Sequence, residues 1–119
     1  MLTSGKAVKV TLYLADGAKH HGIPVYSTVL DSLFKSGIAG ATVLKGVAGF
    51  GAGHRMHSAH ILDISDDLPL LVKFIDTREK VEAILPELQA LTGSGLIEME
   101  EIEIVVPTRK ETSAVVREV

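Results

Sequence analysis

The chain has 119 residues, a length that suits one domain with one hydrophobic core. It has no cysteine, which excludes disulfides, thiolate metal ligands and thiol nucleophiles, and its net charge of −3 offers no basic field for nucleic acid or an anionic membrane. Hydrophobic residues make up 46% of the chain and the mean hydropathy is +0.30. So much apolar surface favours self-association, with an unusually apolar core as the alternative.

The first residues lack the long apolar run of a signal peptide, and no segment is as long and apolar as a membrane span. We therefore expect a cytoplasmic protein that does not insert into a membrane.

The first half of the chain predicts a strand, a helix and a second strand. A strand is predicted over Ala7–Ala15 from the alternation of Val8, Val10, Leu12 and Leu14. A loop over 16–22 follows. Pro24 suits the first turn of a helix, where its missing amide hydrogen would have no partner, and Gly37 is placed to end that helix. The second strand begins at Ala41.

The middle of the chain predicts a loop, a buried strand and the start of a second helix. Residues 54–67 are expected to be mostly loop, with a short strand at 60–64. Residues 68–75 are apolar at both alternating sets of positions, which predicts a strand buried on both faces. Asp76 and Glu79 have the spacing of a capping pair for the helix that follows.

The last third predicts this second helix and a final strand. Pro86 lies inside the apolar stripe of the helix, where we expect it to kink or break the helix. The final strand follows the turn Gly93-Ser94-Gly95. Its alternation slips at Glu100-Glu101, which indicates a bulge or two short strands.

The predicted order β-α-β-β-α-β indicates an α+β fold of the ferredoxin-like type, an antiparallel sheet with two helices on one face. The whole chain, 1–119, is expected to form a single domain, with flexible ends at 1–6 and 107–119.

A glycine-rich segment follows the second strand and is the first candidate binding site. Gly46, Gly49, Gly51 and Gly53 could let main-chain amides approach a nucleotide, or could simply allow a tight, flexible hairpin. Nearby cations could neutralise a phosphate or be solvated loop charges; these are Lys45, His54 and Arg55.

All five histidines fall in two short stretches, His20-His21 and 54–60. Imidazoles are common zinc, copper and nickel ligands, so a metal site at His54, His57 and His60 is an alternative function, although this spacing aligns only in a 3₁₀ turn. A pH-responsive loop is a further alternative.

Catalysis has little support in the sequence. No nucleophile elbow or triad signature is present, so we expect a protein that is not an enzyme. A small acyl- or phosphoryl-transfer enzyme is the remaining alternative.

Three strings carry a resemblance to a known family: Gly37-Ile38-Ala39-Gly40-Ala41-Thr42-Val43, Gly49-Phe50-Gly51, and Leu68-Pro69 before a strand. With them the chain resembles the PII signalling superfamily, and it is closer still to the PII-like branch named domain of unknown function 190. The resemblance covers most of residues 7–106.

The resemblance implies a homotrimer that binds an adenine nucleotide between subunits and requires no cofactor. It also implies that a loop at 49–67 reports the bound nucleotide to a transporter or a regulated enzyme. Thr42 and Gly49-Phe50-Gly51 would line the adenine side and Gly93-Ser94-Gly95 would meet phosphate. The full predicted set is Thr42, Lys45, Gly49, Phe50, Gly51, Gly53, Arg55, Gly93, Ser94 and Gly95.

The chain departs from the PII pattern at positions that contact phosphate. Ala52-Gly53 stands where PII proteins have Arg-Gln, and Leu96 stands where they have a lysine. The arginine-rich end of the last strand is Ile104-Val105-Val106 here, and no tyrosine lies in the loop. Among AMP, ADP and ATP, these departures favour AMP or ADP, or a different small molecule.

Overall fold

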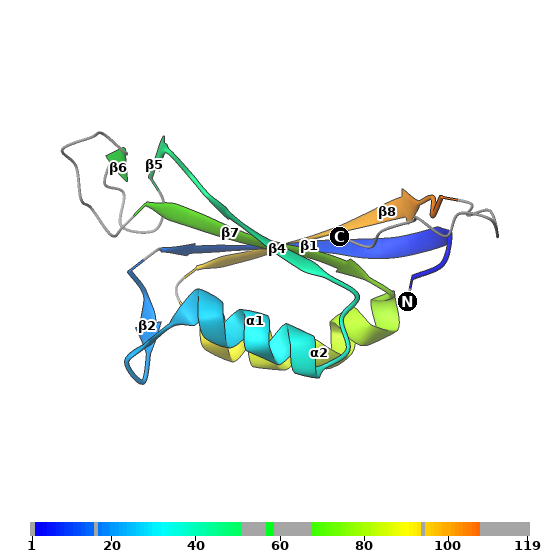
Figure 1. The fold of residues 1–119 in the computed structure, drawn as a ribbon, viewed down its shortest axis with the longest axis horizontal. Helices are drawn as coiled ribbons and strands as arrows, with labels where there is room; N and C mark the ends of the chain where they lie inside the picture. The colour runs from blue at the N-terminus through cyan, green and yellow to red at the C-terminus, as the bar shows by residue number, and fades with distance from the viewer. Residues whose placement is uncertain (1, 16, 51–56, 59–67, 94, 108–119) are drawn as a thin grey trace, which may run out of the picture.

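A computed structural model describes residues 2–15, 17–50, 57–58, 68–93 and 95–107. Figure 1 shows a twisted sheet with two helices packed on one of its faces. The elements in chain order are β1 (Gly5–Ala15), β2 (Lys19–His20), β3 (Ile23–Pro24), α1 (Val25–Lys35), β4 (Ala41–Lys45), β5 (Ala48–Gly49), β6 (His57–Ser58), β7 (Pro69–Asp76), α2 (Arg78–Thr92) and β8 (Leu96–Ile104).

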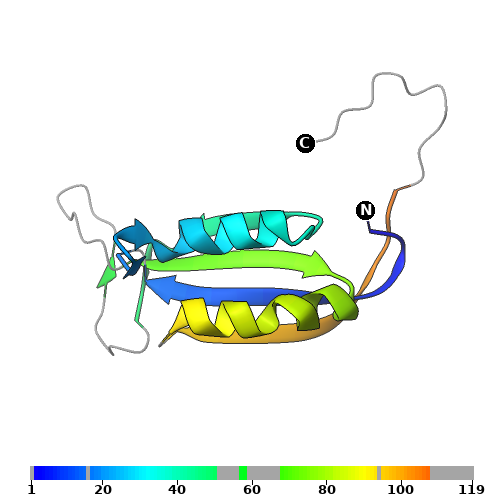
Figure 2. The ribbon, with the colours of Figure 1, turned by 90° about the horizontal axis from the view of Figure 1, so that it is seen from below.

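The main sheet has the strand order β4-β7-β1-β8, and every neighbouring pair is antiparallel. Two small two-stranded ladders, β2 with β3 and β5 with β6, lie outside it. The helices lie side by side across the same face of the sheet (Figure 2). This arrangement confirms the predicted ferredoxin-like α+β fold.

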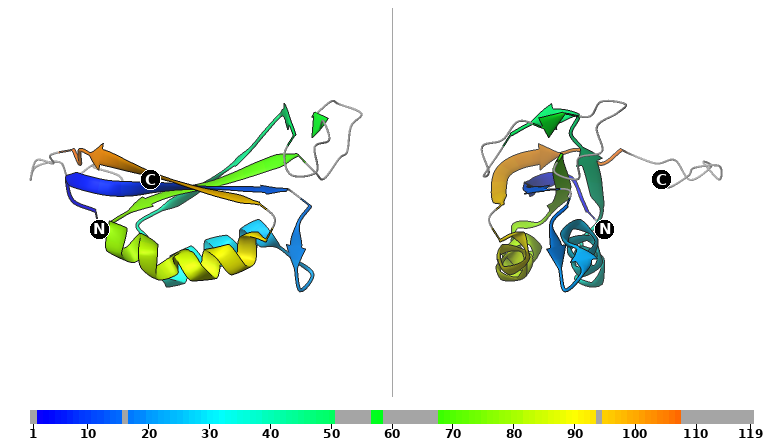
Figure 3. Two further views of the ribbon diagram at one scale, coloured as in Figure 1. Left: turned by 180° about the vertical axis from the view of Figure 1, so that it is seen from behind. Right: turned by 90° about the vertical axis from the view of Figure 1, so that its left-hand side faces the viewer.

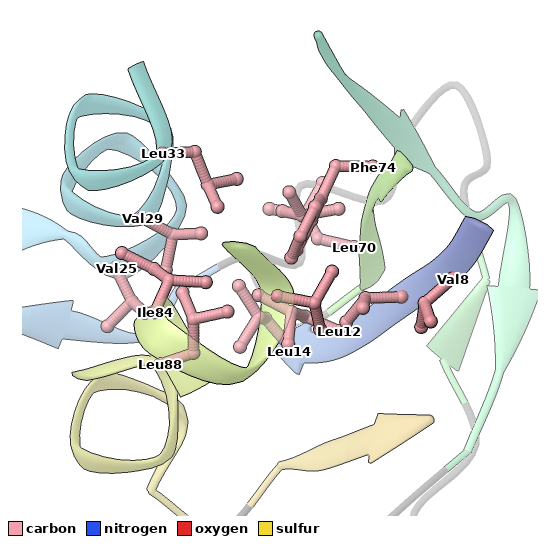
Figure 4. Packing of buried hydrophobic residues seen from close by; sticks show 13 residues of the cluster. Val8, Leu12, Leu14, Val25, Val29, Leu33, Leu70, Phe74, Ile84 and Leu88 are labelled. Carbon is pink, nitrogen blue, oxygen red and sulfur yellow. The ribbon is translucent and has the colours of Figure 1, made fainter. Parts of the chain in front are cut away.

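The core lies between the helices and the sheet (Figure 4). Alternate residues of β1 and β7 point into it, and the apolar stripes of both helices meet them. The buried apolar residues of this cluster are Val8, Val10, Leu12, Leu14, Val25, Val29, Leu33, Leu70, Val72, Phe74, Val81, Ile84 and Leu88. Between the helices, the Ser32 hydroxyl of α1 donates a hydrogen bond to the Glu87 carboxylate of α2.

The ends of α1 follow from its sequence. Pro24, which has no amide hydrogen to donate, is the residue directly before the first turn. At the other end, Gly37 has φ +77, and its amide donates to the carbonyl of Phe34 while the amide of Ile38 donates to that of Leu33. This pair of bonds is the Schellman motif, for which glycine is the preferred residue.

The start of α2 differs from the prediction. The N-cap is Thr77, whose hydroxyl accepts from the amide of Lys80, and not Asp76 in a pair with Glu79. Asp76 is 1% exposed, and its carboxylate accepts from the amides of Ala39 and Thr77. It faces the core from the end of β7 and so fastens the loop before β4 to the start of α2.

Three further expectations are corrected. The loop predicted over 16–22 contains β2 and leads into a short hairpin with β3. Of the kink or break predicted at Pro86, the break is absent, because α2 is continuous from Arg78 to Thr92. The last strand pairs with β1 in one unbroken register from Leu96 to Ile104, with no bulge. The hydrophobic alternation of β8 changes phase at Glu100-Glu101. The reason is that Glu101 lies on the helix side of the sheet beside Arg78, whereas Ile102 and Ile104 lie on the opposite face.

Only one face of β7 is fully buried. Leu70, Val72 and Phe74 are buried, whereas Leu71, Lys73 and Ile75 on the other face are half-buried. The prediction of a strand buried on both faces is therefore wrong for the single chain.

Candidate functional site

The described residues of the predicted site gather at one end of the sheet. In the register, Lys45 of β4 and Leu14 of β1 both stand opposite Leu70 of β7, and Tyr13 of β1 stands opposite Leu96 of β8. The end of β4, the start of β7 and the start of β8 therefore share one end of the molecule, which also carries β5 and β6 (Figure 3). We call this the glycine end.

Two glycines that follow β4, Gly46 and Gly49, lie close to Pro69, which leaves little space for a side chain at either position. The amide of Gly46 donates to the Pro69 carbonyl at 2.7 Å, and a β-carbon at Gly46 would lie 2.9 Å from Pro69 Cγ. Gly49 has φ +155 and pairs with His57, and a β-carbon there would lie 3.3 Å from the same Cγ. These two glycines shape the base of the loop, and the amide of Gly46 is already engaged within the chain.

Side chains beside this turn are exposed. Phe50 is 61% exposed, an unusual state for a phenylalanine, and Thr42 and Lys45 are exposed on β4. An aromatic ring and an ammonium group are thus presented beside the turn, whereas the Thr42 hydroxyl lies three residues earlier on β4 and, by alternation, on the opposite face of the sheet from Lys45. These are groups that can stack on a base and contact polar or anionic parts of a ligand.

The turn between α2 and β8 contains two further glycines of the predicted site, Gly93 and Gly95. Gly93 has φ +60 and ends the helix. A β-carbon at Gly95 would lie 2.3 Å from the carbonyl oxygen of Tyr13 and 2.9 Å from Cγ2 of Thr92. Close packing against β1 therefore accounts for Gly95 without any ligand.

The structure does not bring the two groups of site residues together within one chain. Thr42, Lys45 and Gly49 belong to the β4 edge, whereas Gly93 and Gly95 precede the opposite edge strand, β8. The two edge strands are three strand spacings apart, roughly 14 Å. Of the predicted residues, Gly51, Gly53, Arg55 and Ser94 lie outside the described residues.

The metal alternative falls mostly on undescribed residues. His54 and His60 lie outside the described residues, and of His57 only its place in β6 is described. Within the described ranges, no three histidine or carboxylate side chains gather where they could hold a metal ion. In that same part of the chain, neither helix has the length and hydropathy to cross a bilayer.

The sheet face opposite the helices, here called the open face, carries a feature that the sequence reading missed. One cross-strand row is entirely apolar or aromatic and consists of Leu44, Leu71, Tyr13 and Leu96. Tyr13, Leu44 and Leu96 are 37%, 46% and 61% exposed. In the sequence these residues belong to separate segments. They form one row only when the pairing register of the strands is known.

Charged groups flank this apolar row. The Tyr13 hydroxyl donates to Glu98 Oε1 at 2.9 Å, and this hydrogen bond raises the pKa of Tyr13 because it favours the protonated phenol. Lys9 Nζ lies 3.7 Å from Glu100 Oε1. Lys73 stands next to Thr11 in the register and is half-buried, and no ion pair of its own is found among the described residues. The open face thus carries an apolar row with charged side chains next to it.

A surface cavity of about 470 Å³ lies at the other end of the sheet and contains no predicted site residue. Arg78 borders it and pairs with Glu82 at 3.3 Å and Glu101 at 2.8 Å, hydrogen bonds that raise its pKa. The cavity lining is Lys6, Ala7, Val8, Arg78, Glu101, Ile102 and Glu103.

Comparisons with known proteins relate the chain to a sequence family. The model of the family DUF190, described as "Uncharacterized ACR", matches residues 7–104. The UPF0166 protein MJ1524 of Methanocaldococcus jannaschii is 33% identical over 93 residues, which cover 77% of this chain and 85% of that protein.

The fold is also that of solved PII-like proteins. One is CPII, a nitrogen regulatory PII-like protein of Thiomonas intermedia K12, solved with ADP, AMP and bicarbonate bound. It superposes with a TM-score of 0.65 at 21% identity and covers 86% of this chain and 91% of that one.

Proposed function

Because this chain belongs to the DUF190 family, we propose that it is a PII-like regulator that forms a homotrimer and binds AMP or ADP between subunits. We further propose that residues 49–67 convey the bound state to a partner protein, such as a transporter or a regulated enzyme, and that the chain itself is not an enzyme. The observation that carries the proposal is the separation of the site residues onto opposite edges of the sheet.

That separation favours a site made by two copies. Within one chain, roughly 14 Å of sheet separate the β4 edge with Thr42 and Lys45 from the turn at Gly93–Gly95. A cyclic assembly places different surfaces of neighbouring copies against each other. The β4 edge of one copy could then adjoin the β8 edge of the next, with a ligand between them.

The open face supports self-association independently. Leu44 and Leu96 are 46% and 61% exposed in the single chain, and apolar surface of this kind is commonly covered by a partner. If a neighbouring copy buries the Lys73 ammonium group, that charge has to be paired with an anion. Glu98 or Glu100 of the neighbouring copy could provide the carboxylate. Packing between copies would also bury the second face of β7, which its apolar sequence favours.

The exposed groups of the glycine end suit a nucleotide. The Phe50 ring can stack on adenine, and such stacking contributes about 1–3 kcal/mol per base. Lys45 can meet a phosphate as a point charge. That CPII, with the same fold, was solved with ADP and AMP supports this choice of ligand class.

Titration calorimetry of the purified protein tests the proposal with AMP, ADP, ATP and cyclic AMP, each with and without bicarbonate. We expect AMP or ADP to bind more tightly than ATP, and Phe50→Ala and Arg55→Ala to weaken binding without changing the mass measured by sedimentation. Phe34→Ala is the matched control, because Phe34 is also exposed but lies on α1. The nucleotide proposal fails if no nucleotide gives heat, and the trimer proposal fails if the protein sediments as a single chain.

Hydrogen exchange tests the role of residues 49–67. We expect bound nucleotide to slow exchange in this segment relative to the core strands. Equal exchange with and without nucleotide would contradict the signalling part of the proposal, because a ligand can switch only a segment that responds to it.

A further inference from the structure

The hairpin formed by β2 and β3 has a turn with unusual backbone angles. His20 pairs with Ile23, so His21 and Gly22 form a two-residue turn. Both have positive φ, +52 for His21 and +79 for Gly22. Positive φ at both central residues defines the type I′ turn, in which Asn-Gly is the favoured pair. His21 therefore occupies a position where asparagine or glycine would be less strained.

The turn brings two imidazole rings to the same side of the chain. Neighbouring residues of a regular strand point to opposite faces, so two adjacent histidines in a strand could not share a ligand. Here the ring centroids of His20 and His21 are 4.3 Å apart, with the ring planes at 70°. A pair of imidazoles this close can turn toward one ion without moving the backbone far.

The surroundings leave these rings available. Both histidines are exposed, and among the described residues the contact between the two rings is the one interaction of their side chains. The neighbouring cation, Lys19, precedes His20 in β2, so alternation directs it to the opposite face. The hairpin lies beside the start of α1, at the glycine end (Figure 3).

From this geometry we propose that His20 and His21 form a two-histidine chelating site for a late first-row divalent metal ion. Imidazole nitrogen suits Cu²⁺, Ni²⁺ and Zn²⁺, and of these Cu²⁺ binds a given nitrogen site most tightly. Water or an added ligand completes the coordination shell, because the described residues supply no third protein ligand. The site is separate from the nucleotide site proposed above and does not depend on it.

The test uses a variant in which His20 and His21 are the only histidines, namely His54→Ala, His57→Ala and His60→Ala combined, since the chain has five. Cu²⁺ is titrated into this tag-free protein and followed by calorimetry and by electron paramagnetic resonance. We expect one bound Cu²⁺ per chain, with a spectrum showing nitrogen ligands.

Two single substitutions in that background then assign the ligands. His20→Ala removes one ring, and His21→Asn removes the other while it keeps a residue suited to the turn. We expect each to lower the Cu²⁺ affinity at least about tenfold, since even groups that only support metal ligands contribute 10- to 100-fold. Ile23→Ala, opposite His20 in the ladder, is the control and should leave the affinity unchanged.

Two outcomes would overturn the proposal. One is the absence of Cu²⁺ binding by the triple variant while circular dichroism shows that it is folded. The other is unchanged affinity in both His20→Ala and His21→Asn. Neither outcome affects the nucleotide titrations, so the two proposals fail separately.

Discussion

The two ends of the main sheet are held together in different ways. At the end where α2 starts, side chains bind backbone groups of the loops. The Asp76 carboxylate accepts from the amides of Ala39 and Thr77 at 2.8 and 2.7 Å, and Lys80 Nζ donates to the Gly37 carbonyl at 3.0 Å. At the glycine end, backbone fits against backbone, and Gly46 and Gly95 leave no room for a side chain.

This difference shows how a small domain can pack its loops at both ends and still present exposed side chains at one of them. Where side chains fasten the loops, they are occupied and Asp76 is buried. Where glycine lets the main chain pack directly, the neighbouring Phe50 side chain is 61% exposed. The glycines of the candidate site thus have a structural role in addition to any contact with a ligand.

The largest expected effect comes from Gly95→Ala at the glycine end. The added β-carbon would meet the Tyr13 carbonyl at 2.3 Å, and neither that backbone atom nor Thr92 can move without disturbing β1 or α2. We expect a loss of about 3 kcal/mol in the free energy of unfolding, at the upper end of overpacking effects. Urea denaturation followed by circular dichroism measures it.

Gly40→Ala is the matched control, because its backbone is in an ordinary conformation and nothing lies within 4 Å of the added atom. It should be neutral or slightly stabilising, since alanine restricts the unfolded chain. If both variants lose equal stability, close packing is not the reason for glycine at position 95.

An effect of similar size is expected from Asp76→Ala at the opposite end. The substitution leaves the amides of Ala39 and Thr77 without their acceptor in a buried place. Unsatisfied buried donors cost about 1–3 kcal/mol each, so a loss of roughly 2–4 kcal/mol in the free energy of unfolding is expected, allowing for partial access of water.

Asp31→Ala provides the comparison for Asp76. Asp31 is an exposed aspartate whose carboxylate pairs with Lys35 at 2.9 Å on the same helix. Exposed pairs of this kind contribute about 0.3–0.5 kcal/mol, so its loss should be small. A similar loss for the two aspartates would mean that the buried carboxylate does not fasten this end.

The misassignment of the helix cap shows why the sequence alone could not find this role. Asp76-Thr77 offers two successive capping residues, and the pair Asp76 and Glu79 fits the capping-box spacing. The choice depends on the register, because Asp76 stands opposite Val8 on the helix side of the sheet and is drawn inward. Local pattern therefore placed the helix correctly but named the wrong cap.

Thr77→Ala tests the corrected cap and should have a smaller effect than Asp76→Ala. The variant loses only the acceptor for the Lys80 amide, at a distance of 3.3 Å. Loss of a threonine N-cap costs about 1 kcal/mol. Thr77→Ser, which keeps the hydroxyl, should restore nearly all of the stability in the same urea experiment. A loss in Thr77→Ser as large as in Thr77→Ala would exclude the hydroxyl as the cap.

The fold was predictable because each element carries its own periodicity, whereas the site depends on pairing between distant elements. Alternation in β1 and the stripe of α2 fixed the layers, and the family resemblance located the glycines. The open face escaped prediction because Leu44, Tyr13 and Leu96 become neighbours only through the register. The Glu100-Glu101 slip was misread for a similar reason, since the position of Arg78 explains it.

The smallest expected effect is a change in the ionisation of Tyr13 on the open face. Its hydroxyl donates to Glu98, and ionisation breaks this bond and places two negative charges together, so the pKa of Tyr13 is raised above 10.0. In a Tyr26→Phe background Tyr13 is the only tyrosine, because the chain has two. Glu98→Ala should then lower the pH at which phenolate absorbance appears, and Glu100→Ala should change it less. If Glu98→Ala leaves the titration unchanged, the hydroxyl does not pair with Glu98 in solution.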